Sequence, residues 1–208
     1  GDDGLEWVTD ANNAAGNPEN SAGNTHIGLD YMGLGYTARW EAETAGGFIF
    51  RDLGIPAGSI ITEAYIQFTS IEATSGSCPT DGCMNAGDSA PANLIVHAVA
   101  DTAPTEIPDK VDTDPILARP QVTANVEWVV PEWTTKGASG AEQATPDLTA
   151  LLQEVVDLGT WGPDSDDVMF VIMNNDGDAT EGYRQIATFE EGGASIPTLH
   201  FTYTPPAP

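Results

Sequence analysis

The stretch "GGFIFRDLGIPAGSIITEAYIQFTSIEA", residues 46–73, decides the fold class. It begins with a short apolar run, passes through a Gly-Ile-Pro-Ala-Gly turn, and continues as a long segment in which apolar and polar residues alternate. That alternation is typical of a strand with one face on a core and one face in solvent. The two predicted faces carry Ile60, Ala64, Ile66 and Phe68 on the core side, and Glu63, Tyr65 and Gln67 on the solvent side. The stretch therefore predicts two strands joined by a turn.

Further strands are indicated by "ANLIVHAVA", "QVTANVEWVV", "DVMFVIMN", "YRQIATFE" and "PTLHFTYT". In "QVTANVEWVV" every second residue from Val122 to Trp128 is apolar, which predicts one face on a core. "DVMFVIMN" is apolar on both faces and predicts a buried central strand. One helix is indicated, with Thr145 as its cap and Pro146 in its first turn, and with leucines and a valine at helical spacing before Gly159.

Many short strands with Gly and Pro turns and a single helix favour an all-β fold. We expect a β-sandwich of mainly antiparallel strands with one short α-helix and long loops. No repeat or linker divides the chain, so residues 1–204 are predicted to form a single domain, followed by a Pro-rich tail at 205–208.

The charge of the chain excludes several partners. It has 32 acidic and 6 basic residues and a formal net charge of -26. Such a surface repels nucleic acid, heparin and anionic lipid heads and attracts cations. No run approaches the ~18 apolar residues of a membrane span. Gly1 is not an initiator residue, so we expect a secreted or cell-surface protein whose signal peptide is removed. Cell-surface attachment here includes association with an outer membrane. We expect the protein to be a monomer.

The two cysteines, Cys78 and Cys83, are predicted to form a local disulfide. The four residues between them contain Pro79, Asp81 and Gly82, which let the chain turn back on itself. Two free thiols or half of a zinc site are the alternatives, but no Cys-x-x-Cys partner is present elsewhere in the chain to complete a zinc site. The disulfide indicates an oxidising compartment.

No catalytic motif is present. The chain lacks GxSxG, HExxH, a Gly-rich phosphate loop and a cysteine nucleophile with a paired histidine. Carboxylate pairs are expected by chance among 32 acidic residues, so they do not indicate a glycosidase. We therefore expect a protein that is not an enzyme.

Two acidic loops are candidate calcium sites, because calcium takes about six to eight oxygen ligands. The first, "NNDGDATEG", carries Asn174, Asp176, Asp178 and Glu181 around Gly177. The second and weaker one, "GPDSDD", carries Asp164, Asp166 and Asp167. The alternative for both is a solvated turn in a very acidic protein.

The three histidines differ in their surroundings. Alternation in "PTLHFTY" places His200 on the solvent face of a strand. His97, in "NLIVHAVA", takes the place of an aliphatic residue, and His26 shares a face with Asn24, Gly28 and Asp30. If His26 and His97 meet across adjacent strands, their imidazoles offer a two-nitrogen site that suits Cu(I). A histidine satisfied within the core is the alternative for His97.

The succession "FIFRDLGIPAGSIITEAYIQF", "NLIVHAVADTAPT", "ARPQVTANVEWVVPEW", "QATPDLTALLQEVVDLGTWG" and "GYRQIATFEEGGASIPTLHFTY" resembles the secreted copper-binding surface proteins of methanotrophs, the MopE and CorA family. The resemblance covers roughly residues 47 to 204. It implies a mononuclear copper site, held largely as Cu(I) rather than Cu(II), with His26 and His97 as ligands. In that family an oxidised tryptophan, a kynurenine, stands two residues before the first histidine, where this chain has Asn24. Asn24, a water, Met32 or another tryptophan is then the third ligand.

The leading function is therefore copper capture or storage at the cell surface. The alternative is a calcium-stabilised carbohydrate-binding or adhesive module of a secreted protein, which would stack sugars on exposed aromatic residues such as Trp133 or Trp161. Both tryptophans are equally compatible with a place in the core.

Overall fold

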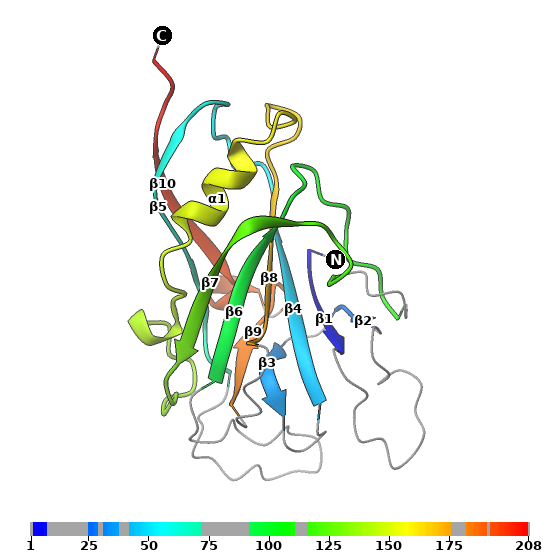
Figure 1. Ribbon diagram of the computed structural model, residues 1–208. Helices are drawn as coiled ribbons and strands as arrows, with labels where there is room; N and C mark the ends of the chain where they lie inside the picture. The colour runs from blue at the N-terminus through cyan, green and yellow to red at the C-terminus, as the bar shows by residue number, and fades with distance from the viewer. Residues whose placement is uncertain are drawn as a thin grey trace.

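The computed structural model of the chain (Figure 1) describes residues 2–7, 25–28, 31–37, 42–71, 92–110, 116–175, 182–190 and 192–207. Within these residues the strands are β1 Asp3–Trp7, β2 Thr25–His26, β3 Tyr31–Thr37, β4 Ala42–Phe50, β5 Ile60–Gln67, β6 Ala92–Val99, β7 Gln121–Val130, β8 Val168–Asn174, β9 Tyr183–Ala187 and β10 Thr198–Thr204. The helices of the same residues are α1 Thr149–Val156 and the 3-10 helices η2 Ala141–Gln143 and η3 Gly193–Ser195.

The first layer is an antiparallel sheet in which six strands follow the order β2-β1-β4-β8-β6-β7. β8 lies between β4 and β6, and all of its residues except Met173 are buried. The prediction of a buried central strand at "DVMFVIMN" is confirmed. A strand with neighbours on both edges and packing on both faces has no solvent side, and its sequence is accordingly apolar throughout.

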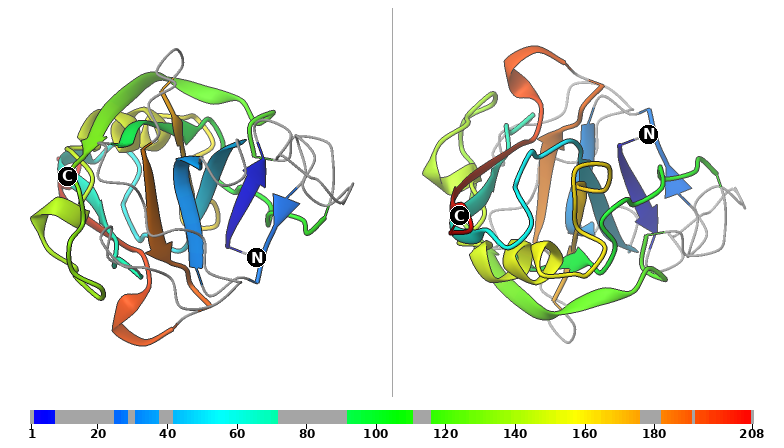
Figure 2. Two further views of the ribbon diagram at one scale, coloured as in Figure 1. Left: turned by 90° about the horizontal axis from the view of Figure 1, so that it is seen from below. Right: turned by 90° about the horizontal axis from the view of Figure 1, so that it is seen from above.

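The second layer faces the first and is built around β5. β3 pairs with β4 and with β9, and β9 is bonded to the residues that follow β5, with the amide of Ala187 3.0 Å from the carbonyl of Thr69. β5 pairs with β10 in a second antiparallel sheet. β5 and β10 lie on the opposite side of the molecule from β1 and β2 (Figures 1 and 2). The predicted all-β sandwich is confirmed, and α1 packs against β5, β6 and β7.

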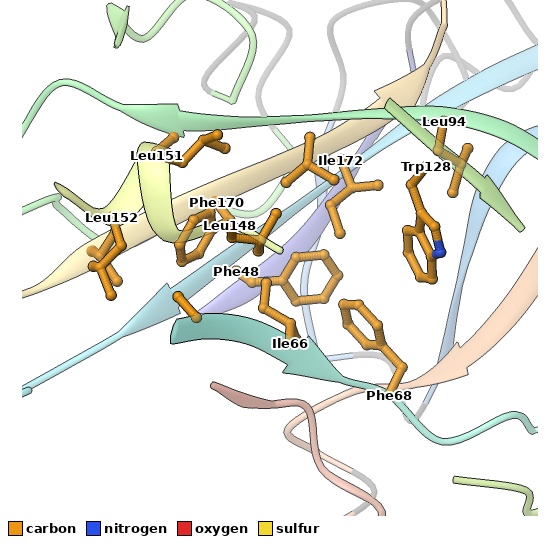
Figure 3. Packing of buried hydrophobic residues seen from close by; sticks show 14 of the residues in the cluster. Phe48, Ile66, Phe68, Leu94, Trp128, Leu148, Leu151, Leu152, Phe170 and Ile172 are labelled. Atoms are coloured by element: carbon orange, nitrogen blue, oxygen red, sulfur yellow. The ribbon is translucent and has the colours of Figure 1, made fainter. Parts of the chain in front are cut away.

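The main core lies between the two layers and contains aromatic rings from both (Figure 3). Phe68, directly after β5, makes an edge-to-face contact with Phe48 of β4, at 5.2 Å between ring centroids. It also stacks on Trp128 of β7 at 5.9 Å. The predicted inward face of "QVTANVEWVV" is therefore confirmed at Trp128, which is buried.

A second apolar cluster covers the outer face of the first layer. It consists of Ile49, Val99, Ile107, Ile116, Met169 and Val171. Ile107 and Ile116 come from the connection between β6 and β7, which approaches β4 closely at Gly47. A Cβ atom at Gly47 would lie 2.7 Å from Cε of Met169, so glycine is the residue that allows this connection to lie flat on the sheet.

Two local predictions are wrong. Ile60 is 63 % exposed and Ile61 takes its place in the core, because the pairing of β5 with β10 shifts by one residue at a bulge between Thr202 and Tyr203. The helix begins at Thr149 rather than after Thr145. Thr145 Oγ1 instead accepts a hydrogen bond from the amide of Ile66 at 3.0 Å, which ties the residues before α1 to β5.

Candidate functional site

An open groove of about 660 Å³ lies beside β5. One wall is β5 itself and the other is the segment 140–147, which contains η2 and leads into α1. Its lining residues are Thr62, Glu63, Ala64, Tyr65, Gln67, Gly140, Ala141, Ala144, Thr145 and Asp147. Tyr65 is the aromatic member of this set, and Glu63 and Asp147 are its charged members.

The floor of the groove is held by backbone hydrogen bonds between its two walls. The amide of Thr145 donates to the carbonyl of Ile66 at 3.0 Å, and the amide of Leu148 donates to that of Ala64 at 2.7 Å. The side-chain amide of Gln67 reaches across to the carbonyl of Gly140 at 3.1 Å. The groove is therefore formed by fixed backbone rather than by long side chains, as is usual for a pre-formed ligand site.

Tyr65 is positioned by a cross-strand partner. Tyr65 and His200 lie opposite each other on β5 and β10, and their rings stack with 4.8 Å between centroids and 11° between planes. β10 lies on one side of β5 and the segment 140–147 on the other. His200 covers one face of the Tyr65 ring, and Tyr65 also lines the groove. The prediction that His200 occupies a solvent-side position is confirmed, since it is exposed.

The charge of the groove is negative. Asp147 accepts hydrogen bonds from the amide of Thr149, at 2.9 Å, and from its hydroxyl group. These two bonds lower the pKa of Asp147, and the bond from the hydroxyl group has the larger effect. Asp147 therefore stays ionised well into the acid range. Glu63 is exposed on the opposite wall. The lining residues include no lysine, arginine or histidine.

Sequence reasoning placed Tyr65 and Glu63 on a solvent face but did not find the groove. The missing information was the position of the segment 140–147, which the sequence indicated as the start of a helix. The sequence did contain one sign of the site, namely a solvent-side aromatic ring in each of two strands, Tyr65 in β5 and His200 in β10. Only the strand register shows that these two residues lie opposite each other.

The two tryptophans predicted as exposed sugar platforms are instead buried. Trp133 is 1 % exposed, and its Nε1 donates to the carbonyl of Glu142 at 3.0 Å. Trp161 is 6 % exposed, and its Nε1 donates to the carbonyl of Ile55 at 2.8 Å. Both indoles therefore pack in the core and use their single donor on a loop carbonyl, as buried tryptophans commonly do.

The expectation that His26 and His97 lie on adjacent strands is wrong. His26 is in β2, where its backbone pairs with Leu5 of β1, and His97 is in β6. β1, β4 and β8 lie between these strands, so four steps of about 4.8 Å, about 19 Å in all, separate them across the sheet. Two imidazoles bound to one metal ion need far closer backbones. Copper binding itself stays a prediction.

Met32, another residue considered for copper, does not lie beside His97. His97 is half-buried, and burial lowers its pKa, which favours a neutral imidazole. It lies opposite Val171, on the outer face of the first layer. Met32 is 1 % exposed and belongs to the main core, on the other face. Asn24 lies outside the described residues.

Most of the first predicted calcium loop also lies outside the described residues, including Asp176, Asp178 and Glu181. Its first member, Asn174, ends β8, is buried, and donates a hydrogen bond from its side chain to Oε1 of Glu43 at 3.2 Å. Calcium at this loop stays a prediction. The predicted disulfide of Cys78 and Cys83 lies outside the described residues as well.

Part of the second predicted calcium loop comes together with Asp52. Oxygens of Asp52, Asp166 and Asp167 lie within 4.8 Å of one another. Asp166 accepts from the amide of Gly54 at 2.7 Å and Asp167 from that of Asp52 at 2.9 Å. Arg51 donates to the second oxygen of Asp167 at 2.9 Å. These bonds fix the connection between β4 and β5, and the guanidinium adds a positive charge beside the cluster. Calcium at this second loop stays a prediction.

A buried carboxyl group at the start of β1 makes stability depend on pH. Asp3 is 1 % exposed, and burial raises its pKa to about 7, although the amide of Phe189 acts in the opposite direction. The neighbouring carboxylates of Glu190 and Asp2 raise it further. In the unfolded chain the pKa of this carboxyl group has its ordinary value of 3.8. Between pH 3.8 and about 7 the folded state therefore binds more protons than the unfolded state does. Stability from this group is complete below pH 3.8 and is lost as pH rises toward 7.

We therefore expect Asp3→Asn to be more stable than the wild type at pH 8 and similar to it near pH 4. Between these limits the difference in free energy of unfolding should grow by up to about 1.4 kcal/mol per pH unit. Urea unfolding at several pH values measures it, with the exposed Glu127→Gln as the matched control. A difference that is the same at every pH would show that Asp3 is ionised in the folded protein throughout.

Comparison with known proteins found no protein-family model and no curated protein that matches the chain. The resemblance to the copper-binding surface proteins of methanotrophs therefore stays a prediction. In the described part of the chain, no helix has the length and apolar character needed to span a bilayer.

Proposed function

We propose that this protein is a non-catalytic carbohydrate-binding module of a secreted protein, and that it holds a glycan in the groove beside β5. The observation that carries the proposal is the ring of Tyr65, which is supported on one face by His200 and lines a groove whose walls are held by backbone hydrogen bonds. A sugar presents an apolar face to an aromatic ring and hydroxyl groups to carboxylates, amides and backbone carbonyls.

The shape of the groove favours an extended chain over a single sugar. It follows β5 from Thr62 to Gln67, and five strand steps of about 3.3 Å give about 17 Å. Both of its long walls are continuous backbone, and its ends are marked by polar side chains, Thr62 and Gln67. A linear oligosaccharide lying along the strand fits this outline.

The charges support binding rather than glycoside hydrolysis. A glycosidase needs one carboxyl group whose pKa is raised, so that it can protonate the leaving oxygen. The pKa of Asp147 is lowered by the hydroxyl and amide of Thr149, which makes it a poor acid. Its oxygens serve as hydrogen-bond acceptors at the start of α1 and at the rim of the groove.

The first test is the loss of binding in a Tyr65 variant. We expect Tyr65→Ala to weaken binding of linear oligosaccharides by about 2 kcal/mol, or about thirtyfold in Kd, because it removes the central aromatic contact. Tyr65→Phe, which keeps the ring, should bind within about threefold of the wild type. Isothermal titration calorimetry with β-1,4-linked hexasaccharides gives the Kd values, and retardation in a gel containing polysaccharide gives an independent reading.

The matched control is Val129→Ala, which removes another solvent-exposed side chain, 63 % exposed on β7 and outside the groove. It should bind as the wild type does. If no oligosaccharide binds, or if Tyr65→Ala binds with unchanged Kd while its thermal unfolding is normal, the groove is not a glycan site.

A further inference from the structure

We infer that the groove beside β5 selects glycans of protonated amino sugars, such as β-1,4-linked glucosamine, over neutral and anionic ones. This inference rests on the proposed function and adds to it the chemical class of the ligand. It is carried by the placement of Glu63 on the β5 wall, two residues before Tyr65, and of Asp147 on the facing wall of the same groove.

The first step is the charge of the lining. Glu63 and Asp147 are its two charged residues, both are exposed, and no basic residue lines the groove with them. The chain as a whole has 32 acidic and 6 basic residues, so the field from the remaining surface has the same sign. A uronic acid or a sulfated sugar would therefore be repelled before it reached Tyr65.

The second step is the position of the charges relative to the ring. Tyr65 follows Glu63 by two residues on β5, so the two side chains stand on the same face of the strand. Asp147 comes from the facing wall, beyond the backbone bond that joins Leu148 to Ala64. A chain stacked on Tyr65 thus lies in a groove that has a carboxylate on each wall, and an ammonium group on its rings can approach either of them.

The third step is that the carboxylate on the facing wall is fixed. Asp147 is held by Thr149 and stays ionised under mildly acidic conditions, in which sugar amines are protonated. Its oxygen therefore does not have to be ordered when the ligand binds, which reduces the entropy cost of an exposed ion pair. A neutral sugar gains only a hydrogen bond from the same oxygen.

The experiment compares three β-1,4-linked hexamers that differ only in the group on carbon 2: glucose, with a hydroxyl, glucosamine, with an ammonium, and N-acetylglucosamine, with a neutral acetamide. Titration calorimetry at pH 5.5 and low salt should give about tenfold tighter binding of the glucosamine hexamer than of the other two. The ratio should fall to about threefold or less in 0.5 M NaCl, because salt screens exposed charges.

Two variants test which charges are responsible. Glu63→Gln with Asp147→Asn keeps the hydrogen-bonding shape of both side chains and should bring the ratio between the glucosamine and glucose hexamers close to one. Glu127→Gln removes an exposed charge from β7, outside the groove, and should leave the ratio unchanged. Circular dichroism and thermal unfolding establish that each variant is folded.

The possible outcomes separate this inference from the function on which it rests. If all three hexamers bind with equal Kd and Tyr65→Ala abolishes binding, the glycan site stands and the amino-sugar selection is wrong. If none of the three binds, the proposed function itself fails. A hexalysine peptide is the remaining control, and binding as tight as that of the glucosamine hexamer would attribute the effect to cation attraction alone and overturn the inference.

Discussion

Phe68→Ala is expected to lower the free energy of unfolding by about 3 to 5 kcal/mol, the usual range for truncating a buried phenylalanine. Phe68 is fully buried, and it joins the two layers of the sandwich. Its ring contacts Phe48 of β4 edge-on and stacks on Trp128 of β7 (Figure 3). Alanine leaves a cavity between two rings of the first layer, and the sheets cannot close it because their spacing is set by many other side chains.

Urea unfolding followed by tryptophan fluorescence measures this change, and the melting temperature should fall by roughly 10 °C. The matched control is Ile60→Ala at the start of β5, where a 63 % exposed side chain predicts a change within about 0.5 kcal/mol. Equal destabilisation by the two substitutions would mean that Phe68 is not buried between the layers.

Much of the fold could be predicted because alternation is a local signal. The apolar pattern of "DVMFVIMN" predicts burial on both faces, and that of "QVTANVEWVV" predicts burial on one. The structure confirms the central position of the first strand and the inward face of the second. The exchange of Ile60 for Ile61 could not be predicted. It depends on a bulge whose position is set by the pairing with β10, more than a hundred residues further along the chain.

Whether His26 and His97 lie on adjacent strands could not be predicted for the same reason. The residue pattern can say that His26 and His97 occupy strands, but strand order decides whether two strands are neighbours, and it is a property of the whole sheet. β1 and β4 pair with each other, and this places β2 at an edge and removes it from β6. The groove beside β5 was out of reach because it needs two segments about 80 residues apart to be joined by backbone hydrogen bonds.

His200 lies beside the candidate site, although the sequence did not single it out as a functional histidine. His200 was predicted to be an ordinary solvent-side residue, and by itself that position is ordinary. The register of β5 and β10 gives it a second property, because it backs the ring of Tyr65. In the proposed glycan site its role is therefore indirect, through the orientation of that ring.

Arg184→Met is the second substitution for which we expect a large effect, a loss of about 3 to 5 kcal/mol of unfolding free energy. Arg184 is 1 % exposed in β9, and its guanidinium donates to the carbonyls of Pro131, at 2.8 Å, and Val130, at 3.1 Å. Val130 is the last residue of β7 and Pro131 directly follows it. β7 is not a neighbour of β9 in the sheet. The substitution leaves both of them without the charged donor, and hydrogen bonds to charged groups contribute about 1.5 to 3 kcal/mol each.

The opposing effect in this prediction is the cost of burying a guanidinium, which methionine does not have. We expect the lost hydrogen bonds to outweigh it, because Val130 is buried and methionine offers no donor to its carbonyl, while the bond to Pro131 is partly buried. Arg184→Lys is the informative control: it keeps the charge but offers a compact ammonium in place of a planar fork, so its stability should lie between those of the wild type and the methionine variant. Urea unfolding of the three proteins decides the point. A methionine variant as stable as the wild type would show that Arg184 stabilises the joint between β9 and the end of β7 no more than an apolar side chain of similar length.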